Sequence, residues 1–574
     1  MNMMNVLIMK NYSDLIKILS KKNSFSEEKF LIWKRKIASQ TKTSLITNAK
    51  LLSLYRQMAK SKEIKANKNL ENFLRKRKIR TLSGVAPVAV LTKVYQCPGQ
   101  CLYCPTEKNM PKSYLSNEPA VMRAKLCDFH PFKQVALRIK ALEENGHEAD
   151  KIELIVMGGT WNYLPAKYRL WYIYACFKAA NNPKIKLKIQ KSKIKSAIQN
   201  AKLKNIEINK TIKLKTINQV TWRDLYNEQK KNETAKHRIV GLTLETRPDY
   251  ITEKTAWQMR ALGCTRVELG VQHLDDKILK LNKRGATTKD TIRATKILRG
   301  LGFKITYHLM LNLLGANQKK DFLMFQKIFS DPNFQPDQIK IYPCVVNEYA
   351  ELYRWWKMKK YKPYTTKQLT ALLIKIKKIM PYYVRIIRVI RDIPEESIAA
   401  GNKITNLRAL LNTSCKCIRC REVGHVIKDQ KLKVKSQKLG KIKLFIQKYL
   451  AGDGEEYFLS FEATDRKILY AFCRLYLSIN KTSITNSYVI RTPFISLFAC
   501  IRELHTYGQL VPIGAKLKRA SQHQGLGQKL LLQAEKIAKE NGFKKIAVIA
   551  GIGTRKYYQK FGYHLENTYM IKNI

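Results

Sequence analysis

The sequence predicts an α/β protein: a large incomplete barrel of parallel strands, then a smaller α+β domain, with a basic helical segment in front. Three observations support this. Between about residues 85 and 345, strand-like apolar runs alternate with helical stretches six times, and six strand–helix units imply a parallel sheet. From about residue 455 the pattern changes to strands, a glycine turn and a long amphipathic helix. Before residue 81 the chain is helical and basic.

The N-terminal segment, residues 1–80, is predicted to be helical and ends in the basic string Asn72–Arg80. The whole chain carries 108 Lys and Arg against 43 Asp and Glu, a formal net charge of +65. Such a field favours a polyanionic partner, and lysines at this density suit phosphate contacts. An AT-rich genome would enrich lysine but would not deplete glutamate. The composition therefore favours nucleic-acid binding, although any single lysine fits a solvated helix face equally well.

The barrel domain is expected over residues 81–395, and its chemistry is expected at the C-terminal ends of the strands. The predicted strands are Val88–Tyr95, Ile152–Met157, Ile239–Leu244, Arg266–Val271, Phe303–Leu309 and Gln338–Tyr342. A helix over Phe132–Asn145 is closed by Gly146, as is typical of helix C-termini. Residues 184–236 are rich in lysine and lack clear periodicity. They are predicted to be a basic insertion, either touching nucleic acid or simply tolerated at the surface.

Three cysteines, Cys97, Cys101 and Cys104, follow the first strand in the string CPGQCLYC. Thiolates spaced C-x3-C-x2-C can hold three irons of a cubic iron–sulfur cluster and leave the fourth iron open to a small molecule. A zinc clip or a set of free cysteines is the alternative. The spacing resembles the signature of the radical S-adenosylmethionine (SAM) superfamily. There the open iron chelates SAM, and one electron cleaves it to a 5′-deoxyadenosyl radical.

Two strand ends carry candidate SAM-binding residues. Gly158 and Gly159 end the second strand, and glycine lets a backbone approach a ligand closely. They resemble the turn that binds the amino-acid part of SAM, with a plain tight turn as the alternative. Glu245 and Arg247 end the third strand in TLETRPDY. A carboxylate and a guanidinium there can bind ribose hydroxyls and a carboxylate; an internal salt bridge is equally open.

The remaining strand ends are also polar. Gln272 ends the fourth strand, His308 the fifth, and Lys340 and Tyr342 the sixth. His308 alone would fit a satisfied core histidine. Several polar groups at the ends of strands in one barrel indicate a site more strongly than any one of them.

The connector, residues 396–450, has its own cysteine set in CKCIRC. Cys415, Cys417 and Cys420 lie within six residues, which indicates zinc or a second cluster. His425 or a distant residue is a candidate fourth ligand, and free thiols are the alternative. Twelve cysteines, six of them in two tight groups, fit metal ligation in a reducing compartment better than a disulfide framework.

The C-terminal domain, residues 451–574, is predicted to open with strands such as Tyr457–Phe461 and Ile468–Tyr476. A glycine turn then starts a long amphipathic helix within Gln522–Gly542. Backbone N–H groups at such a turn can bind a pyrophosphate, aided by the helix dipole. The candidate positions are Gln524, Gly525, Leu526 and Gly527.

The pattern Q-x-x-G-x-G at this turn resembles the acetyl-coenzyme A (acetyl-CoA) loop of GNAT acetyltransferases. A strand at Lys545–Ala550 and a helix at Thr554–Phe561 follow in the order of that fold. Tyr557 and Tyr558 lie where GNAT enzymes often place a tyrosine beside the thioester sulfur. Core aromatics are the alternative for both.

A radical SAM barrel joined to a GNAT domain resembles the Elongator catalytic subunit family, in a prokaryotic single-chain form. The resemblance runs from about residue 79 to 574, without the insertion at 184–236, which has no counterpart in the eukaryotic form. The short first gap between cluster cysteines also suits prokaryotic members. The strings that carry it are IRTLSGVAPVAVLTK, EPAVMRA, VMGGT, ETRPDY, GCTRVELGVQ, KIYP, IRDIP, CIRCREVG, IRELHTYG, QHQGLG and GTRKYYQKFGY.

The resemblance implies a transferase that makes 5-carboxymethyluridine at the wobble position of tRNA. Acetyl-CoA supplies the two-carbon unit, and a SAM-derived radical takes a hydrogen from its methyl group. The carbon radical adds to uridine C5, and water cleaves the thioester. The implied cofactors are a 4Fe-4S cluster, SAM, acetyl-CoA as substrate and zinc at the connector cysteines. Lys340 and Tyr342 match the K-x-Y-P string in the cleft between the domains and are the candidate catalytic residues.

The implied partners are a tRNA anticodon stem–loop and an electron-donor protein, in the cytoplasm. The chain has no apolar run long enough to span a bilayer and no signal-peptide cleavage site. The oligomeric state stays open, a homodimer included. One alternative function is a protein lysine acetyltransferase with a structural cluster, although no acidic residue stands out as its general base. A non-catalytic tRNA-binding protein is the third reading.

Overall fold

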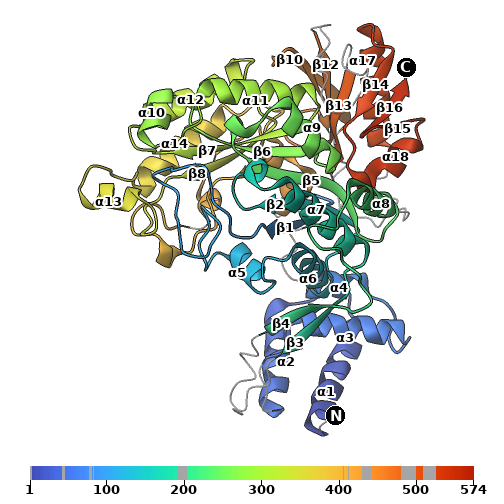
Figure 1. Cartoon of the computed structure of the whole chain (residues 1–574). Coiled ribbons are helices and arrows are strands. Elements are labelled where there is room, and N and C mark those ends of the chain that lie inside the picture. The colour runs from blue at the N-terminus through green and yellow to red at the C-terminus, as the bar shows by residue number, and fades with distance from the viewer. Residues whose placement is uncertain are drawn as a thin grey trace.

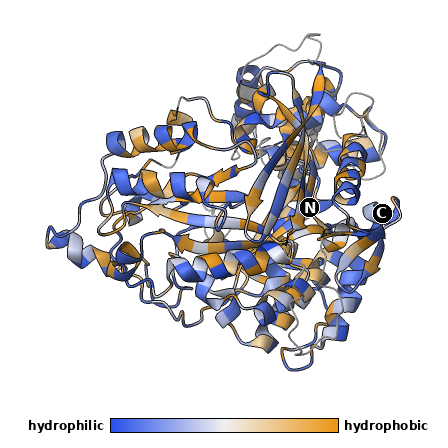
Figure 2. Cartoon of the chain, turned by 90° about the horizontal axis from the view of Figure 1, so that it is seen from above, coloured by the Kyte–Doolittle hydropathy of each residue, from blue (hydrophilic) through white to orange (hydrophobic). Residues whose placement is uncertain are grey.

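The computed structural model describes residues 3–41, 45–75, 81, 83–189, 203–404, 406–411, 413–429, 441–479, 499–507 and 525–574. Figure 1 shows three parts: N-terminal helices in blue, a central sheet wrapped by helices, and a C-terminal sheet in orange and red. Figure 2 shows hydrophilic and hydrophobic residues alternating around the helices, as expected where one helix face packs on a core.

The N-terminal part is helical, as predicted. It consists of α1 (Met3–Ser20), α2 (Glu27–Gln40), α3 (Asn48–Lys60) and α4 (Lys68–Leu74). Ser26, Thr47 and Asn67 cap the last three helices by accepting hydrogen bonds from backbone N–H groups. These helices bury a small core of their own. Arg56 joins this core to the barrel domain by donating to the backbone oxygen of Glu143, at 2.9 Å.

The central sheet has seven strands, all parallel, in the order β1-β2-β5-β6-β7-β8-β9. Its strands are β1 (Ala86–Leu91), β2 (Lys151–Met157), β5 (Arg238–Thr246), β6 (Arg266–Gln272), β7 (Lys304–Leu311), β8 (Gln338–Pro343) and β9 (Arg385–Arg388). The order has two ends, so the barrel is incomplete, as predicted. All six predicted strands are present, although β1 ends four residues before the expected Tyr95. The seventh strand, β9, was not predicted.

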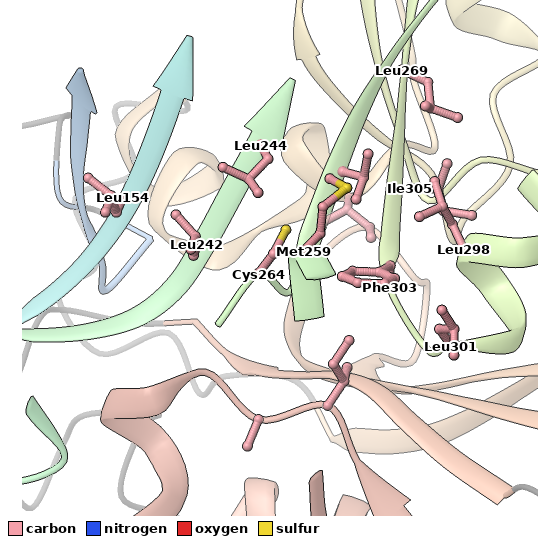
Figure 3. Packing of buried hydrophobic residues seen from close by; sticks show 14 of the residues in the cluster. Leu154, Leu242, Leu244, Met259, Cys264, Leu269, Leu298, Leu301, Phe303 and Ile305 are labelled. Atoms are coloured by element: carbon pink, nitrogen blue, oxygen red, sulfur yellow. The ribbon is translucent and has the colours of Figure 1, made fainter. Parts of the chain in front are cut away.

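Nine helices of the described residues accompany this sheet, and several of them bury its core. They are α5 (Pro119–Lys125), α6 (Pro131–Glu144), α7 (Ala166–Asn181), α9 (Glu253–Ala261), α10 (Asp276–Leu281), α11 (Thr288–Gly300), α12 (Gln318–Ser330), α13 (Leu352–Lys357) and α14 (Thr366–Lys378). Figure 3 shows Leu242 and Leu244 from β5 with Leu269 from β6 and Met259 from α9 in this core. The predicted helix end at Gly146 is confirmed, because that glycine has φ +84° after α6.

The described residues of the lysine-rich insertion form regular elements that its composition did not predict. β3 (Ile185–Ile189) pairs antiparallel with β4 (Leu203–Ile208), and this hairpin packs against α6. α8 (Trp222–Asn232) begins with a capping box between Thr221 and Asp224. The predicted insertion therefore contains a hairpin and a capped helix that packs on α7.

The C-terminal sheet has the order β10-β11-β12-β13-β14-β16-β15. Its strands are β10 (Ile442–Ala451), β11 (Gly454–Ala463), β12 (Leu469–Ser478), β13 (Ala499–Thr506), β14 (Lys545–Val548), β15 (His564–Glu566) and β16 (Tyr569–Asn573). Helices α17 (Leu526–Glu540) and α18 (Arg555–Gln559) accompany them. The sheet begins at Ile442, so all but the last residue of β10 lies in the range 396–450 that the sequence assigned to the connector. Two short helices, α15 (Ile418–Arg421) and α16 (Val423–Asp429), precede it.

A fully buried ionic cluster joins the two sheets. Asp337, just before β8, lies 2.5 Å from Arg502 of β13 and 3.4 Å from Arg474 of β12. Glu456 of β11 lies 2.7 Å from Arg502 and 3.1 Å from Arg299 of α11. Burial alone would raise the pKa of Asp337, but the three guanidinium groups outweigh burial and hold that pKa below its ordinary value. The cluster fixes one domain against the other.

Candidate active site

The three cysteines predicted to hold an iron–sulfur cluster lie in the loop after β1. Cys101 is buried, and Cys97 and Cys104 are half-buried. Arg284 Nη1 donates to Cys101 Sγ at 3.6 Å, and the Gly99 N–H donates to Cys97 Sγ at 3.4 Å. Each thiolate of a cubane binds a different iron, so these sulfurs need not converge on one point as the ligands of a single ion do. The loop therefore suits a cluster.

The glycine turn after β2 opens beside this loop. Gly158 and Gly159 have φ +130° and +102°, a region that L side chains avoid. A Cβ on Gly158 would lie 2.0 Å from Thr92 Oγ1, whereas a Cβ on Gly159 would have no atom within 4 Å. Thr160 Oγ1 lies 3.9 Å from Cys97 Sγ. The backbone at Gly159 is thus open to a ligand next to the cluster loop, which fits the predicted SAM turn.

Two buried polar atoms point to a missing ligand at the same place. Arg247 pairs with Asp249 through two hydrogen bonds of 2.9 and 2.7 Å, so the salt-bridge alternative holds for two of its nitrogens. Its third nitrogen, Nη1, has no partner among the described residues and approaches Gly99 of the cluster loop. Gln272, at φ +70°, likewise buries an Oε1 without a partner there. Unpartnered buried polar atoms are costly, so both fit a bound cofactor.

A network of charged side chains connects the next four strands. His308 of β7 lies with Nδ1 3.5 Å from Glu245 Oε1 and Nε2 2.9 Å from Glu268 Oε2. Lys340 Nζ contacts the same Oε2 of Glu268. Tyr114 Oη donates to Glu245 Oε2 at 3.1 Å. His308 is therefore a bridge between two carboxylates rather than an isolated core histidine.

The charges in this network support one another. Burial alone would raise the pKa of Glu268, but Lys340 and His308 hold that pKa well below its usual range. Burial alone would lower the pKa of Lys340, but Glu268 raises it above the ordinary value. Both groups are therefore ionised at neutral pH. The ring of Tyr342 meets His308 edge to face, with centroids 5.5 Å apart. Burial raises the pKa of Tyr342, which keeps its hydroxyl neutral.

Sequence reasoning missed two members of this network. Tyr114 lies in a loop with no local signal of function. Glu268 was visible in the string ELGVQ, but only Gln272 of that string was selected. The structure brings Glu245, Lys340 and Tyr342 together, as predicted for strand ends of one barrel.

The glycine turn of the C-terminal domain lies at the start of α17. Gly525 is the N-cap with φ +71°, and a Cβ there would meet no atom within 4 Å. A Cβ on Gly527 would lie 2.9 Å from Tyr557 Oη. Tyr557 is 40% exposed, whereas Tyr558 is buried and packs on the ring of Tyr563. Of the two tyrosines, Tyr557 thus lies at the turn. Tyr558 is an aromatic residue of the core, which was the alternative for both.

The other two candidate residues of this turn are Leu526 and Gln524. Leu526 is the first residue of α17, so its N–H is one of the helix donors without an intrahelical partner. Gln524 lies outside the described residues. The open N-terminus of α17 with Tyr557 above it fits an acetyl-CoA pyrophosphate and thioester.

The connector cysteines converge. The sulfur atoms of Cys415, Cys417 and Cys420 all lie within 4.8 Å of one another, and among the described residues only this group does so. His425, a candidate fourth ligand, lies with Nε2 2.8 Å from Glu422 Oε1, and it is not among the donor atoms that converge with the three sulfurs. Glu422 in turn pairs with Arg385 at 2.6 Å. The three thiols form a soft donor set that suits zinc.

Comparisons with known proteins identify both domains. Residues 92–325 match the radical SAM superfamily, 336–416 a radical SAM C-terminal domain, and 517–563 the GNAT acetyltransferase family. A tRNA uridine(34) acetyltransferase of Methanocaldococcus jannaschii is 41% identical over 518 residues, 87% of this chain and 86% of that protein. Elongator complex protein 3 of Schizosaccharomyces pombe is 35% identical over 524 residues, 88% of this chain and 87% of that protein.

The chain belongs to the Elongator complex protein 3 family. This membership confirms the predicted radical SAM barrel with a GNAT domain, and it does not favour a lysine acetyltransferase. A solved structure of Elongator complex protein 3 from Methanocaldococcus infernus, which lacks its N-terminal residues, superposes with a TM-score of 0.66. It is 37% identical and covers 86% of this chain and 100% of that one. The parts of this family member that the structure describes contain no helix long and apolar enough to cross a membrane.

Proposed function

We propose that this chain makes 5-carboxymethyluridine at position 34 of tRNA from acetyl-CoA. One observation carries the proposal: a cysteine loop at the mouth of a parallel barrel and an open glycine turn on α17 occur in one chain, joined by a buried ionic cluster. Relatives that share 40–41% identity with it are named tRNA uridine(34) acetyltransferase. The charge of +65 suits an RNA substrate.

The barrel residues would hold the radical-generating cofactors. Cys97, Cys101 and Cys104 would ligate a 4Fe-4S cluster. The backbone at Gly158 and Gly159, with the unpartnered atoms of Arg247 and Gln272 and the carboxylate of Glu245, would bind SAM. When bound, the cluster and SAM supply a radical able to abstract hydrogen, and the protein contributes binding, orientation and exclusion of water.

The C-terminal domain would hold the acetyl donor. N–H groups of Gln524, Gly525, Leu526 and Gly527 would bind the pyrophosphate of acetyl-CoA, and Tyr557 would lie beside the thioester. Tyr558 would support Tyr557 through their edge-to-face contact, with centroids 5.3 Å apart.

Lys340 and Tyr342 are the proposed catalytic residues. Lys340 stays cationic because Glu268 raises its pKa, and a fixed cation in a water-poor site stabilises negative charge on a substrate oxygen. Tyr342 keeps its proton because burial raises its pKa, so it can donate a hydrogen bond to the same region. Both side chains leave β8 on one face, two residues apart.

Further partners complete the proposal. We assign zinc to Cys415, Cys417 and Cys420, with His425 or a more distant residue as the fourth ligand. A tRNA anticodon stem–loop is the macromolecular substrate, and an electron-donor protein reduces the cluster. The chain works in the cytoplasm, where thiols stay reduced.

The test is anaerobic incubation of the reconstituted protein with tRNA, SAM and acetyl-CoA. We expect 5′-deoxyadenosine and 5-carboxymethyluridine to form together. Cys101→Ser is expected to abolish both products while acetyl-CoA binding, measured by calorimetry, stays unchanged. Formation of neither product by the wild-type protein would refute the proposal. Acetylation of protein lysines that survives Cys101→Ser would favour the acetyltransferase alternative.

A further inference from the structure

Three tyrosines from three neighbouring loops form a continuous aromatic edge at the barrel mouth. Tyr95 follows β1, Tyr163 follows β2 and Tyr250 follows β5, and these strands are adjacent in the sheet (Figure 1). The ring centroids of Tyr95 and Tyr163 lie 6.3 Å apart, and those of Tyr163 and Tyr250 lie 5.7 Å apart. Both contacts are edge to face. We call these three residues the tyrosine rim.

Two of the three rim tyrosines are exposed, and the third, Tyr250, is half-buried. Tyr95 and Tyr163 are 39% and 40% exposed, and the neighbouring Val94 is 42% exposed. Single exposed aromatics are ordinary, but a connected group of them indicates a binding surface.

The backbone holds the rim in place. Tyr163 and Tyr250 each end a single 3₁₀ turn. The Asn162 side chain donates from Nδ2 to the backbone oxygen of Tyr250 at 2.9 Å, which ties the two turns together. The Arg247 guanidinium lies 5.8 Å from the Tyr250 ring centroid. The rings of Tyr163 and Tyr250 are thus presented at fixed positions, and little conformational entropy is lost when a ligand binds them.

Each ring is carried by a loop that also carries a proposed cofactor residue. Tyr95 lies two residues before Cys97, and Tyr250 lies three residues after Arg247. Tyr163 lies four residues after Gly159. A molecule seated on the rim therefore lies at the entrance of the proposed radical site.

The charge around the rim is positive. Segments 93–97, 158–168 and 247–254 carry Lys93, Lys167, Arg247 and Lys254 against Asp249 and Glu253. Asp249 is already paired with Arg247. The three lysines are exposed. Exposed rings among cations are the combination that binds single-stranded nucleic acid, with bases on the rings and phosphates at the cations.

We propose that the tyrosine rim is a stacking subsite for an unpaired nucleotide of the anticodon loop beside the target uridine. This inference rests on the proposed function, because it assumes an RNA substrate. Stacking would hold the loop open at the barrel mouth while the uridine enters the site. It uses the π-face of a base, so it tolerates different bases at that position.

The test measures binding of an anticodon stem–loop with uridine at position 34, and of an RNA duplex of equal length, to the full chain. Tyr163→Ala and Tyr95→Ala are expected to weaken stem–loop binding about fivefold or more. Duplex binding should change less than twofold. Tyr163→Phe keeps the ring and should bind like the wild type. Tyr226→Ala is the matched control, because Tyr226 is 49% exposed on α8, outside the rim.

A second readout reports stacking directly. A stem–loop with 2-aminopurine next to uridine 34 should show a fluorescence change on binding that Tyr163→Ala reduces and Tyr163→Phe preserves. Unchanged stem–loop affinity in both alanine variants would overturn the rim, as would an equal loss for stem–loop and duplex. The rim would also be overturned if the alanine variants bound RNA normally but their iron–sulfur cluster were reduced more slowly by an electron-donor protein. Failure of the wild-type chain to bind the stem–loop would instead count against the proposed function, and the rim would fall with it.

Discussion

At the scale of single residues, Glu268 balances the charges of the barrel mouth. Its side chain is 2% exposed and contacts both His308 and Lys340. Glu268→Gln would leave the Lys340 cation buried without its partner, and breaking such a pair costs about 3 kcal/mol or more. We expect chemical denaturation to show a loss of unfolding free energy of this size. Modified uridine should also be lost.

The double variant Glu268→Gln with Lys340→Met separates structure from chemistry. Removing both charges removes the unpaired cation, so most of the lost stability should return. Product formation should not return, because Lys340 is the proposed catalytic cation. Recovery of product together with stability would show that Lys340 is only structural.

Part of this site could be predicted from the positions at which the strands end. This reasoning selected Glu245, Lys340 and Tyr342 because each ends a strand of one parallel sheet. It left an internal salt bridge open for Arg247 but did not identify Asp249, two residues later, as the partner. Nor did it see His308 as a bridge, because that role depends on β5, β6 and β7 lying in consecutive order.

At the scale of elements, the proposed acetyl-CoA turn depends on two glycines for different reasons. Gly525 needs its positive φ, whereas Gly527 needs the absence of a Cβ, which would lie 2.9 Å from Tyr557 Oη. Gly527→Ala should displace Tyr557 and weaken acetyl-CoA binding about tenfold by calorimetry, while SAM binding stays unchanged. Gly300→Ala is the matched control, since a Cβ there meets no atom within 4 Å. Equal effects of the two substitutions would contradict this role for Gly527.

The elements that the sequence missed share a physical cause. β9 has four residues, two of them arginines, and is too short to show alternation. β10 pairs with β11 alone, at the edge of its sheet. Its alternate side chains are exposed and include lysines, so its composition resembled a charged connector. The six predicted strands of the parallel sheet were found because a parallel sheet buried on its faces requires apolar runs.

At the scale of the whole molecule, the proposed function requires two cofactor sites in separate domains to face one substrate. The buried cluster of Asp337, Glu456, Arg299, Arg474 and Arg502 fixes that relation. Its members have no exposed side-chain surface. A rigid boundary suits a reaction in which groups held by both domains must meet, because small misplacements are costly in rate.

Asp337→Asn tests this boundary. The substitution leaves three guanidinium groups without one of their carboxylates, so we expect about 3 kcal/mol lower unfolding free energy at pH 7. We also expect modified uridine to fall more than the binding of SAM or acetyl-CoA alone. Asp453→Asn is the matched control, because the Lys296–Asp453 pair also joins the domains, at 2.8 Å, but is 38% and 48% exposed. Such an exposed pair contributes at most about 1 kcal/mol.

The pH dependence gives the same test a second, independent readout. The pKa of Asp337 lies below its ordinary value of about 3.9 because of the three arginines. A carboxyl group of this kind stabilises the fold fully above its unfolded pKa, and the contribution is lost as pH falls through the folded pKa. The stability difference between wild type and Asp337→Asn should therefore be full at pH 7 and shrink below about pH 4. A difference that stayed constant across this range would show that Asp337 acts through packing rather than charge.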